Sequence, residues 1–179
     1  MLYSEFYSPT NLKSVLAPFG VTNIFAIPRV AKIVVNVGAG DAVENKNVIG
    51  EVVKQITLIT GQKAVITKAR RSVSAFKIRE GLPIGVKVTL RGKKKVAFLD
   101  KLIHIVIPML KDFRGIPYSC VDQSGNLNIG FTEQTIFPEI DFDAIDKLRG
   151  LQVTVTTNAR SHEKGVKFFE LLGVKFAKK

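Results

Sequence analysis

The sequence predicts an α+β fold of two layers, with helices packed on one face of a mainly antiparallel sheet and a polar face on the other side. Three segments alternate apolar and polar residues with the period of two that strands have, namely 30–37, 85–91 and Leu151–Thr157. Three others carry apolar residues at helical spacing, namely Asn47–Thr60, 93–109 and the segment after Ser161. Few helices among several strands indicate this fold class.

The first half of the chain opens with a helix start. Ser8 is a capping residue and Pro9 suits the first helical position, so we expect a helix from there to about Gly20. A strand at 30–37 follows and ends at a glycine turn. The segment Asn47–Thr60 is then an amphipathic helix.

The second half alternates strands with helices. Strands are expected at 64–70 and 85–91, separated by a polar, basic loop, and 93–109 is the next amphipathic helix. A short strand is expected at Leu127–Phe131. After the strand Leu151–Thr157, a final helix is capped by Ser161 and stops at a glycine.

Length and charge bound the function. The 179 residues contain no repeat, low-complexity tract or linker, which predicts a single domain over 1–179. With 27 basic and 15 acidic residues the net charge is +12, so we expect a polyanionic partner. No apolar run approaches the roughly 18 residues of a membrane span, which favours nucleic acid over a membrane. The single cysteine, Cys120, predicts a buried thiol and a reducing compartment.

The positive charge is concentrated in one window. Between 63 and 95 only Glu80 opposes eleven basic residues, so the window carries +10: Lys63, Lys68, Arg70, Arg71, Lys77, Arg79, Lys87, Arg91, Lys93, Lys94 and Lys95. An exposed basic face without a partner is the alternative interpretation.

Strand parity predicts where these charges face. Alternate side chains leave opposite faces of a sheet, so the polar face should hold Lys32, Asn36, Lys87, Thr89, Arg91, Gln152, Thr154 and Thr156. The opposite positions are apolar, including Ala31 and Ile33. No aromatic residue stands on the polar side, which favours a folded RNA read through phosphates, 2′-hydroxyls and groove edges over stacked single strands. A merely solvated sheet explains the alternation but not the cations.

Several long motifs then carry a resemblance. They are, in order, PRVAKIVVNVGAGDA, ITGQKAVITKARRSVSAFKIREGLPIGVKVTLRG, DFRG and GFTEQTIFPEIDFDAIDKLRG. The chain resembles the bacterial-type family of large-subunit ribosomal proteins that bind 5S rRNA. It departs from that family at Val121-Asp122-Gln123, at Leu127, and at Lys95, where the family usually has methionine.

The resemblance implies a structural constituent of the large subunit that helps attach 5S rRNA in the central protuberance, contacts peptidyl-site tRNA and bridges to the small subunit. The implied partners are 5S rRNA, large-subunit rRNA, peptidyl-site tRNA, a basic small-subunit protein and other central-protuberance proteins. No cofactor or metal is expected. The implied location is the ribosome, in a bacterial cytoplasm or an organelle matrix or stroma.

Candidate residues follow from these two lines of reasoning. For 5S rRNA, family positions imply Asn36, Gln62 and Thr89, and the basic residues Lys32, Lys63, Lys68, Arg70, Arg71, Lys87 and Arg91 join them. The polar loop at 72–83 is expected to be mobile, and the resemblance implies that it contacts tRNA through Ser74, Phe76, Lys77 and Arg79. For the bridge, the segment 133–146 has five acids and no base: Glu133, Glu139, Asp141, Asp143 and Asp146. The alternative for that segment is a solvated loop.

Other classes fit less well. A dinucleotide fingerprint after Gly38 and Gly40 would need a third glycine where Val43 stands, so we predict a plain turn. His104 is expected to be partly buried on a helix and His162 exposed, and with one cysteine they make no zinc set. The chain is therefore predicted not to be an enzyme. A general RNA-binding module or RNA chaperone outside the ribosome is the alternative function.

Overall fold

The fold is taken from a computed structural model that describes residues 3–7, 15–43, 45, 47–110, 113–141, 145 and 147–177. The expected helix start at Ser8 and Pro9 lies outside these residues. Its expected end is confirmed, because Gly20 turns into the left-handed region (φ 62°) directly after the 3-10 turn Ala17–Phe19.

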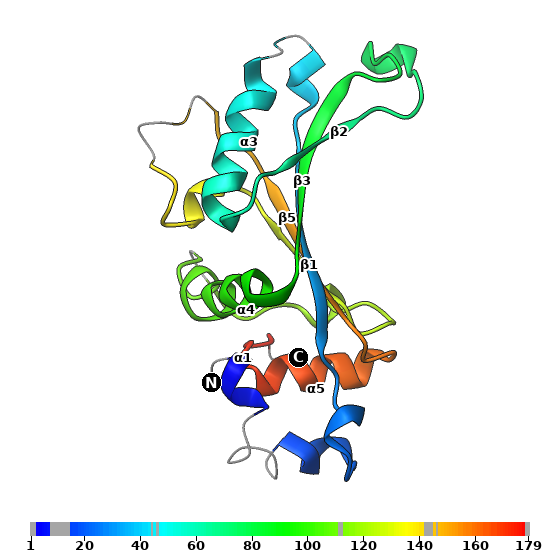
Figure 1. Cartoon of the computed structure of the whole chain (residues 1–179), viewed down its shortest axis with the longest axis vertical. Coiled ribbons are helices and arrows are strands. Elements are labelled where there is room, and N and C mark those ends of the chain that lie inside the picture. Colours follow the sequence, from blue (N-terminus) through cyan, green and yellow to red (C-terminus); the bar gives the residue numbers. More distant parts are fainter. Residues whose placement is uncertain are drawn as a thin grey trace. The chain divides into compact units, whose positions relative to one another are not determined.

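The strands form one antiparallel sheet, as predicted (Figure 1). They are β1 (Val30–Gly38), β2 (Val65–Lys68), β3 (Pro83–Leu90), β4 (Leu127–Phe131) and β5 (Leu151–Thr157). Their order across the sheet is β2-β3-β1-β5-β4. The described helices are α1 (Tyr3–Phe6), α3 (Asn47–Thr60), α4 (Gly92–Lys101) and α5 (His162–Leu171). The predicted α+β class is therefore confirmed.

Two compact units make up the chain. The first contains Met1–Ile33, Arg91–Ile129 and Thr154–Lys179, and the second contains Val34–Leu90 and Gly130–Val153. Each is described by itself.

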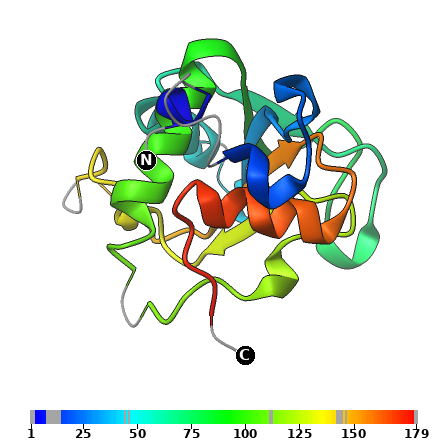
Figure 2. The ribbon, with the colours of Figure 1, turned by 90° about the horizontal axis from the view of Figure 1, so that it is seen from below.

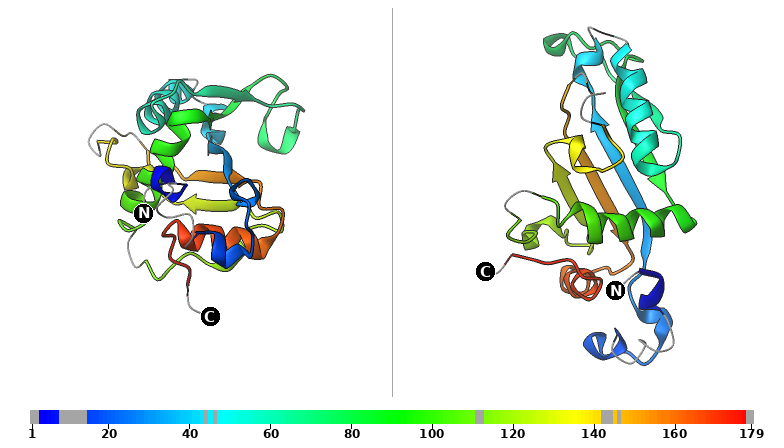
Figure 3. Two further views of the ribbon diagram at one scale, coloured as in Figure 1. Left: turned by 60° about the horizontal axis from the view of Figure 1, so that its bottom comes forward. Right: turned by 90° about the vertical axis from the view of Figure 1, so that its left-hand side faces the viewer.

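In the second unit, α3 lies along β2 and β3 (Figures 1 and 3). Its predicted bounds are confirmed, and its apolar stripe is buried: Ile49, Val52, Ile56 and Ile59. This stripe recurs at the 3.6-residue period, so one helix face covers the apolar side of the strands. Gly61 (φ 62°) ends the helix.

In the first unit, the helix expected at 93–109 changes form partway. After α4, residues Leu102–Val106 form a π-helical turn, with the Ile107 N–H donating to the carbonyl of Leu102. Pro108 lacks an amide hydrogen and its ring conflicts with a preceding carbonyl, which explains why regular helix does not continue. At α5, Ser161 caps the first turn by accepting from the Lys164 N–H, as predicted.

Two strand boundaries and one burial pattern differ from the sequence expectation. β2 is shorter than 64–70, because the ladder shifts between Thr67 and Lys68, where Lys68 pairs with Pro83, a residue that has no N–H to donate. Pro83 therefore begins β3 rather than ending the loop. At the start of β1, Val30 is buried and Ala31 is exposed, so the predicted alternation holds only from Lys32 onward.

Candidate nucleic-acid interface

Strand β3 carries the alternation that the sequence predicts. Lys87 is exposed and Thr89 is half-buried, whereas Val86, Val88 and Leu90 are buried. The buried side chains fix the strand against α3, and the polar side chains are left on the opposite face. A cation and a hydroxyl thus stand two residues apart on a firmly packed strand.

Gln62, in the turn after α3, is tied to the end of β3. Its side-chain amide donates to the Thr89 carbonyl at 3.2 Å. The Gln62 carbonyl accepts from the buried Thr60 hydroxyl, also at 3.2 Å. Two of the three uncharged candidates are therefore connected, with the Gln62 side-chain amide held by the Thr89 backbone and the Gln62 main chain held by the Thr60 hydroxyl.

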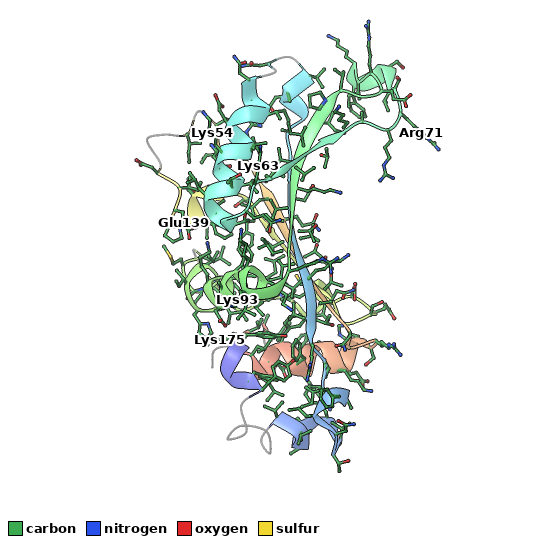
Figure 4. The ribbon with its side chains drawn as sticks, viewed as in Figure 1. Lys54, Lys63, Arg71, Lys93, Glu139 and Lys175 are labelled. Atoms are coloured by element: carbon green, nitrogen blue, oxygen red, sulfur yellow. The ribbon has the colours of Figure 1, made fainter. Side chains whose placement is uncertain are left out.

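Strand β2 pairs with β3 so that Val65 lies opposite Lys87. Opposed residues share a face, so the exposed Val65 places an apolar side chain beside that cation. Lys63, two residues before β2, and Lys68, its last residue, are both exposed (Lys63 is labelled in Figure 4). A Cβ at Gly85 would lie 2.8 Å from the Val37 carbonyl oxygen, so only glycine fits this approach of β3 to β1.

The β1 candidates fall in different units. Asn36, in the second unit, is exposed. Lys32, in the first unit, is half-buried, and Arg91, which precedes α4 in that unit, is exposed. Both cations and the amide thus have solvent-accessible atoms.

The loop between β2 and β3 holds the candidate tRNA contacts and has internal structure. Val73 and Ile78 exchange two backbone hydrogen bonds of 2.9 and 3.1 Å, and Lys77 between them adopts a left-handed φ of 53°. Its exposed side chains include Ser74, Phe76, Lys77 and Arg79, with Arg70 and Arg71 at its base (Figure 4 labels Arg71). Phe76 is 73% exposed. The loop therefore has internal backbone hydrogen bonds. Its mobility, which the composition predicted, stays a prediction.

The acidic segment packs near α3 within the second unit. Glu139 and Asp141 are exposed, whereas Glu133 is half-buried and accepts from the Thr135 hydroxyl. A cavity of about 320 Å³ is lined by Glu139 and Asp141 together with Lys54 and Leu58 of α3. Figure 4 labels Glu139 and Lys54. Asp143 and Asp146 lie outside the described residues.

Sequence reasoning missed the group that anchors this segment. Arg149 donates to both oxygens of Asp41 at 2.6 and 2.7 Å, and Lys147 adds a longer contact of 3.4 Å. These hydrogen bonds, chiefly that from Arg149, lower the pKa of Asp41 to about 2. The buried Gln134 accepts from the Arg149 N–H at 2.6 Å and donates to the Lys147 carbonyl.

The positions that depart from the family pattern form ordinary structure. Asp122 accepts from the N–H groups of Ser124 and Asn126 and so closes the turn before β4. Burial acts to raise the pKa of Asp122, but these hydrogen bonds lower it overall. Lys95 donates to the Val30 carbonyl at 2.6 Å, and burial lowers its pKa. Cys120 is half-buried, not buried as expected.

The two histidines exchange the environments expected of them. His104 is exposed, and His162 is half-buried with its ring Nδ1 3.1 Å from the Val121 carbonyl. Across the described ranges, no three His, Cys, Asp or Glu side chains gather as metal ligands would. No helix within those ranges has the length and apolar character to cross a membrane.

Comparison with known proteins covers nearly the whole chain. Residues 23–79 match the family described as Ribosomal protein L5, and residues 83–176 match the C-terminus of the ribosomal L5 family. Three relatives carry the name large ribosomal subunit protein uL5. Those of Thermoanaerobacter sp. (strain X514) and Desulfotalea psychrophila are 46% and 43% identical over 97% of each chain. That of Desulfatibacillum aliphaticivorans is 47% identical over 89% of each chain.

Proposed function

We propose that this chain, which belongs to the bacterial ribosomal L5 family of large-subunit proteins, binds 5S rRNA and helps attach it in the central protuberance. Members of the family are structural, non-enzymatic components of the large ribosomal subunit, so rRNA and the ribosome are its partners.

The observation that carries the proposal is the linked pair Gln62 and Thr89 beside the exposed Lys87. Amides and hydroxyls can hydrogen-bond 2′-hydroxyls and base edges, whereas lysines and arginines chiefly hold phosphates. Asn36 supplies a further exposed amide from the same unit. The surrounding exposed cations are Lys63, Lys68, Arg70 and Arg71. Lys32 and Arg91 would contribute from the first unit.

The loop between β2 and β3 would contact peptidyl-site tRNA. It presents Phe76 with most of its ring exposed, together with Lys77 and Arg79. A basic loop with one open aromatic ring can meet both the phosphates and an unstacked base of a folded RNA. The basic composition of the loop and the exposure of Phe76 together support this tRNA contact.

The acidic segment would form the bridge to a basic protein of the small subunit. Glu139 and Asp141 are exposed, and carboxylates repel phosphate, so RNA is an unsuitable partner. Phe137 is fully buried and Pro138 follows it, which anchors the segment beside the exposed Glu139 and Asp141. Exposed ion pairs contribute only about 0–1 kcal/mol each and exchange partners readily, which suits an interface between moving subunits.

The decisive experiment combines sedimentation with RNA identification. The chain should remain with large subunits through a high-salt wash, and RNase-protected RNA recovered with the purified chain should be 5S rRNA. Asn36→Ala, Gln62→Ala and Thr89→Ala should each weaken 5S rRNA binding by about 1–3 kcal/mol. Release by salt together with unselective RNA recovery would instead identify an RNA chaperone.

A further inference from the structure

In the first unit, an aromatic ring is held open at the surface. Phe25 lies in the 3-10 turn Ile24–Ala26 and is 74% exposed. The Asn23 side chain accepts from the Phe25 N–H at 2.9 Å, which fixes the backbone that carries the ring. A single exposed aromatic residue is common on protein surfaces, so its neighbours decide its meaning.

The first neighbour is Arg29, whose guanidinium is held between two rings. Its central carbon lies 5.3 Å from the centroid of Phe25 and 5.1 Å from that of Tyr7. The Tyr7 hydroxyl donates to the Pro28 carbonyl at 2.6 Å, and the backbone of Arg29 pairs with Asn158 in both directions. The guanidinium is therefore positioned before any ligand arrives, which lowers the entropy lost on binding.

The second group of cations comes from the segment that enters α5. Arg160 is exposed and has a left-handed φ of 59°, a backbone conformation that residues other than glycine seldom adopt. Non-glycine residues in this region gather at functional sites. Lys164, in the first turn of α5, is also exposed, and Glu163 is the only acid between 158 and 169.

Phe25, Arg160 and Lys164 line one cavity of about 320 Å³, and Arg29, which is not a lining residue, is held against the Phe25 ring. Its lining includes Phe25, Pro28, Asn158, Arg160 and Lys164. Figure 2 shows the segment that carries Phe25 beside α5 within this unit. The volume falls at the lower end of the roughly 300–1,000 Å³ of small-ligand pockets, which suits one nucleobase better than a duplex.

We infer that this pocket is a second RNA-binding site, in which an unpaired rRNA base stacks on Phe25 while Arg29, Arg160 and Lys164 hold the adjacent phosphates. An aromatic platform among cations is how proteins hold unpaired nucleotides. The polar side of the sheet offers cations and amides without such a ring. The inference rests on the proposed function, because it requires that the natural ligand of the chain be rRNA.

An acidic peptide is the main rival occupant. Its carboxylates would engage the three cations, but they would gain nothing from an open aromatic face. The other alternative is that Phe25 and Arg29 only stabilise the fold through their cation–π contact. A buried Phe25 would do this equally well, and the left-handed backbone of Arg160 would have no explanation. The exposed ring and the strained arginine together favour a nucleotide.

Two pairs of variants separate these roles. Phe25→Leu removes the π face and Phe25→Tyr keeps it, and because the ring is mostly exposed both variants should fold. Arg160→Gly removes the guanidinium and suits the backbone, whereas Arg160→Lys keeps the charge. Binding is measured over a salt series to 5S rRNA and, separately, to the rest of the large-subunit rRNA, with chemical probing of base accessibility on each RNA.

Phe25→Leu should weaken binding to one of the two RNAs by about 5- to 150-fold, the range for loss of one base stack, with an unchanged salt slope. One base protected by the unchanged chain and by Phe25→Tyr should become reactive. Arg160→Gly should lower the salt slope by about 1, and Arg160→Lys should not. The RNA that responds identifies the source of the base.

The inference fails if Phe25→Leu binds and protects both RNAs as the unchanged chain does. It also fails if Phe25→Leu loses a protein partner while RNA binding is intact. Asn36→Ala measured in parallel separates the two proposals. If Asn36→Ala weakens 5S rRNA binding and Phe25→Leu has no effect, only the Phe25 site is overturned. If the unchanged chain does not bind 5S rRNA selectively, the proposed function is overturned.

Discussion

The Gln62 side-chain amide donates a hydrogen bond to the Thr89 backbone carbonyl, 3.2 Å away. The bond joins the turn after α3 to the end of β3, and both residues are proposed contacts of 5S rRNA. Gln62 can therefore act in two ways, by touching RNA itself and by holding the strand end that carries the Thr89 hydroxyl.

This relationship predicts that the two residues are coupled. Gln62→Ala and Thr89→Ala should each weaken 5S rRNA binding, and the double variant should lose less than the sum, with a coupling of about 0.5–3 kcal/mol. Filter binding of the four proteins measures it. The control pairs Gln62→Ala with Arg71→Ala, whose effects should add. Strict additivity for both pairs would mean that Gln62 does not position Thr89.

A second prediction concerns Lys87, the exposed cation on β3. Lys87→Ala should lower the salt slope of 5S rRNA binding by about 1, because one phosphate contact and its released counterion are lost. Lys54→Ala is the matched control, since it removes another exposed cation, from α3. Equal changes in slope for both variants would show that only net charge matters.

A third prediction concerns the loop between β2 and β3. The Ala69 N–H donates to the Leu82 carbonyl at 2.8 Å, and the Ala69 carbonyl accepts from Gly81, so the base of the loop closes itself. Replacing 73–79 with a glycine linker should spare 5S rRNA affinity and weaken tRNA retention on assembled ribosomes. Lys77→Gly tests the charge alone, because glycine accommodates the left-handed backbone there.

For the loop, filter binding and tRNA retention must be measured on the same preparations. If 5S rRNA affinity collapses and tRNA retention falls only because assembly fails, the loop lies on 5S rRNA instead.

A fourth prediction follows from the pair of Asp41 and Arg149. The Asp41 pKa is about 2 in the folded chain against 3.8 ordinarily, so its contribution to stability is present above pH 3.8 and is lost as pH falls toward 2. Asp41→Asn should lower the free energy of unfolding at pH 7 by about 1–2 kcal/mol, a figure reduced for the 28% exposure of the carboxylate. Urea unfolding at pH 7 and between pH 4 and 2 measures both effects.

The difference between Asp41→Asn and the unchanged chain should shrink between pH 4 and 2. Glu170→Gln, which removes an exposed carboxylate from α5, should leave stability within about 0.5 kcal/mol. Arg149→Lys should also destabilise the chain, because lysine cannot donate to both oxygens in the planar geometry of a guanidinium. Equal stability of Asp41→Asn and the unchanged chain at pH 7 would refute a stabilising pair.

A fifth prediction concerns the acidic segment. The double variant Glu139→Gln/Asp141→Asn should fold normally and bind 5S rRNA normally, since both side chains are exposed. Association of the two subunits should weaken, most visibly at low magnesium, and extending the change to Asp143 and Asp146 should weaken it further. Glu163→Gln/Glu170→Gln removes the same charge from α5 and should have no effect. If light scattering shows normal subunit association for the acidic-segment variants, the segment is only a solvated loop.

Much of the fold could be predicted from local pattern. The helix Asn47–Thr60 and the strands Leu127–Phe131 and Leu151–Thr157 have the expected bounds, because burial on one face imposes the period of each element on the sequence. The long motifs also predicted the family. Boundaries failed where one residue changed backbone chemistry, as at Pro83 in β3 and at Pro108 after the π-helical turn.

The sequence by itself thus determined the elements, the polar parity of β3 and the class of partner, since periodicity and charge are local properties of the chain. Only the tertiary structure decided the strand order and the pairing of Arg149 with Asp41, which are 108 positions apart. It also decided that His162 is half-buried and that Phe25 stands open beside Arg29. Such contacts depend on which distant segments meet, and no spacing along the chain encodes that.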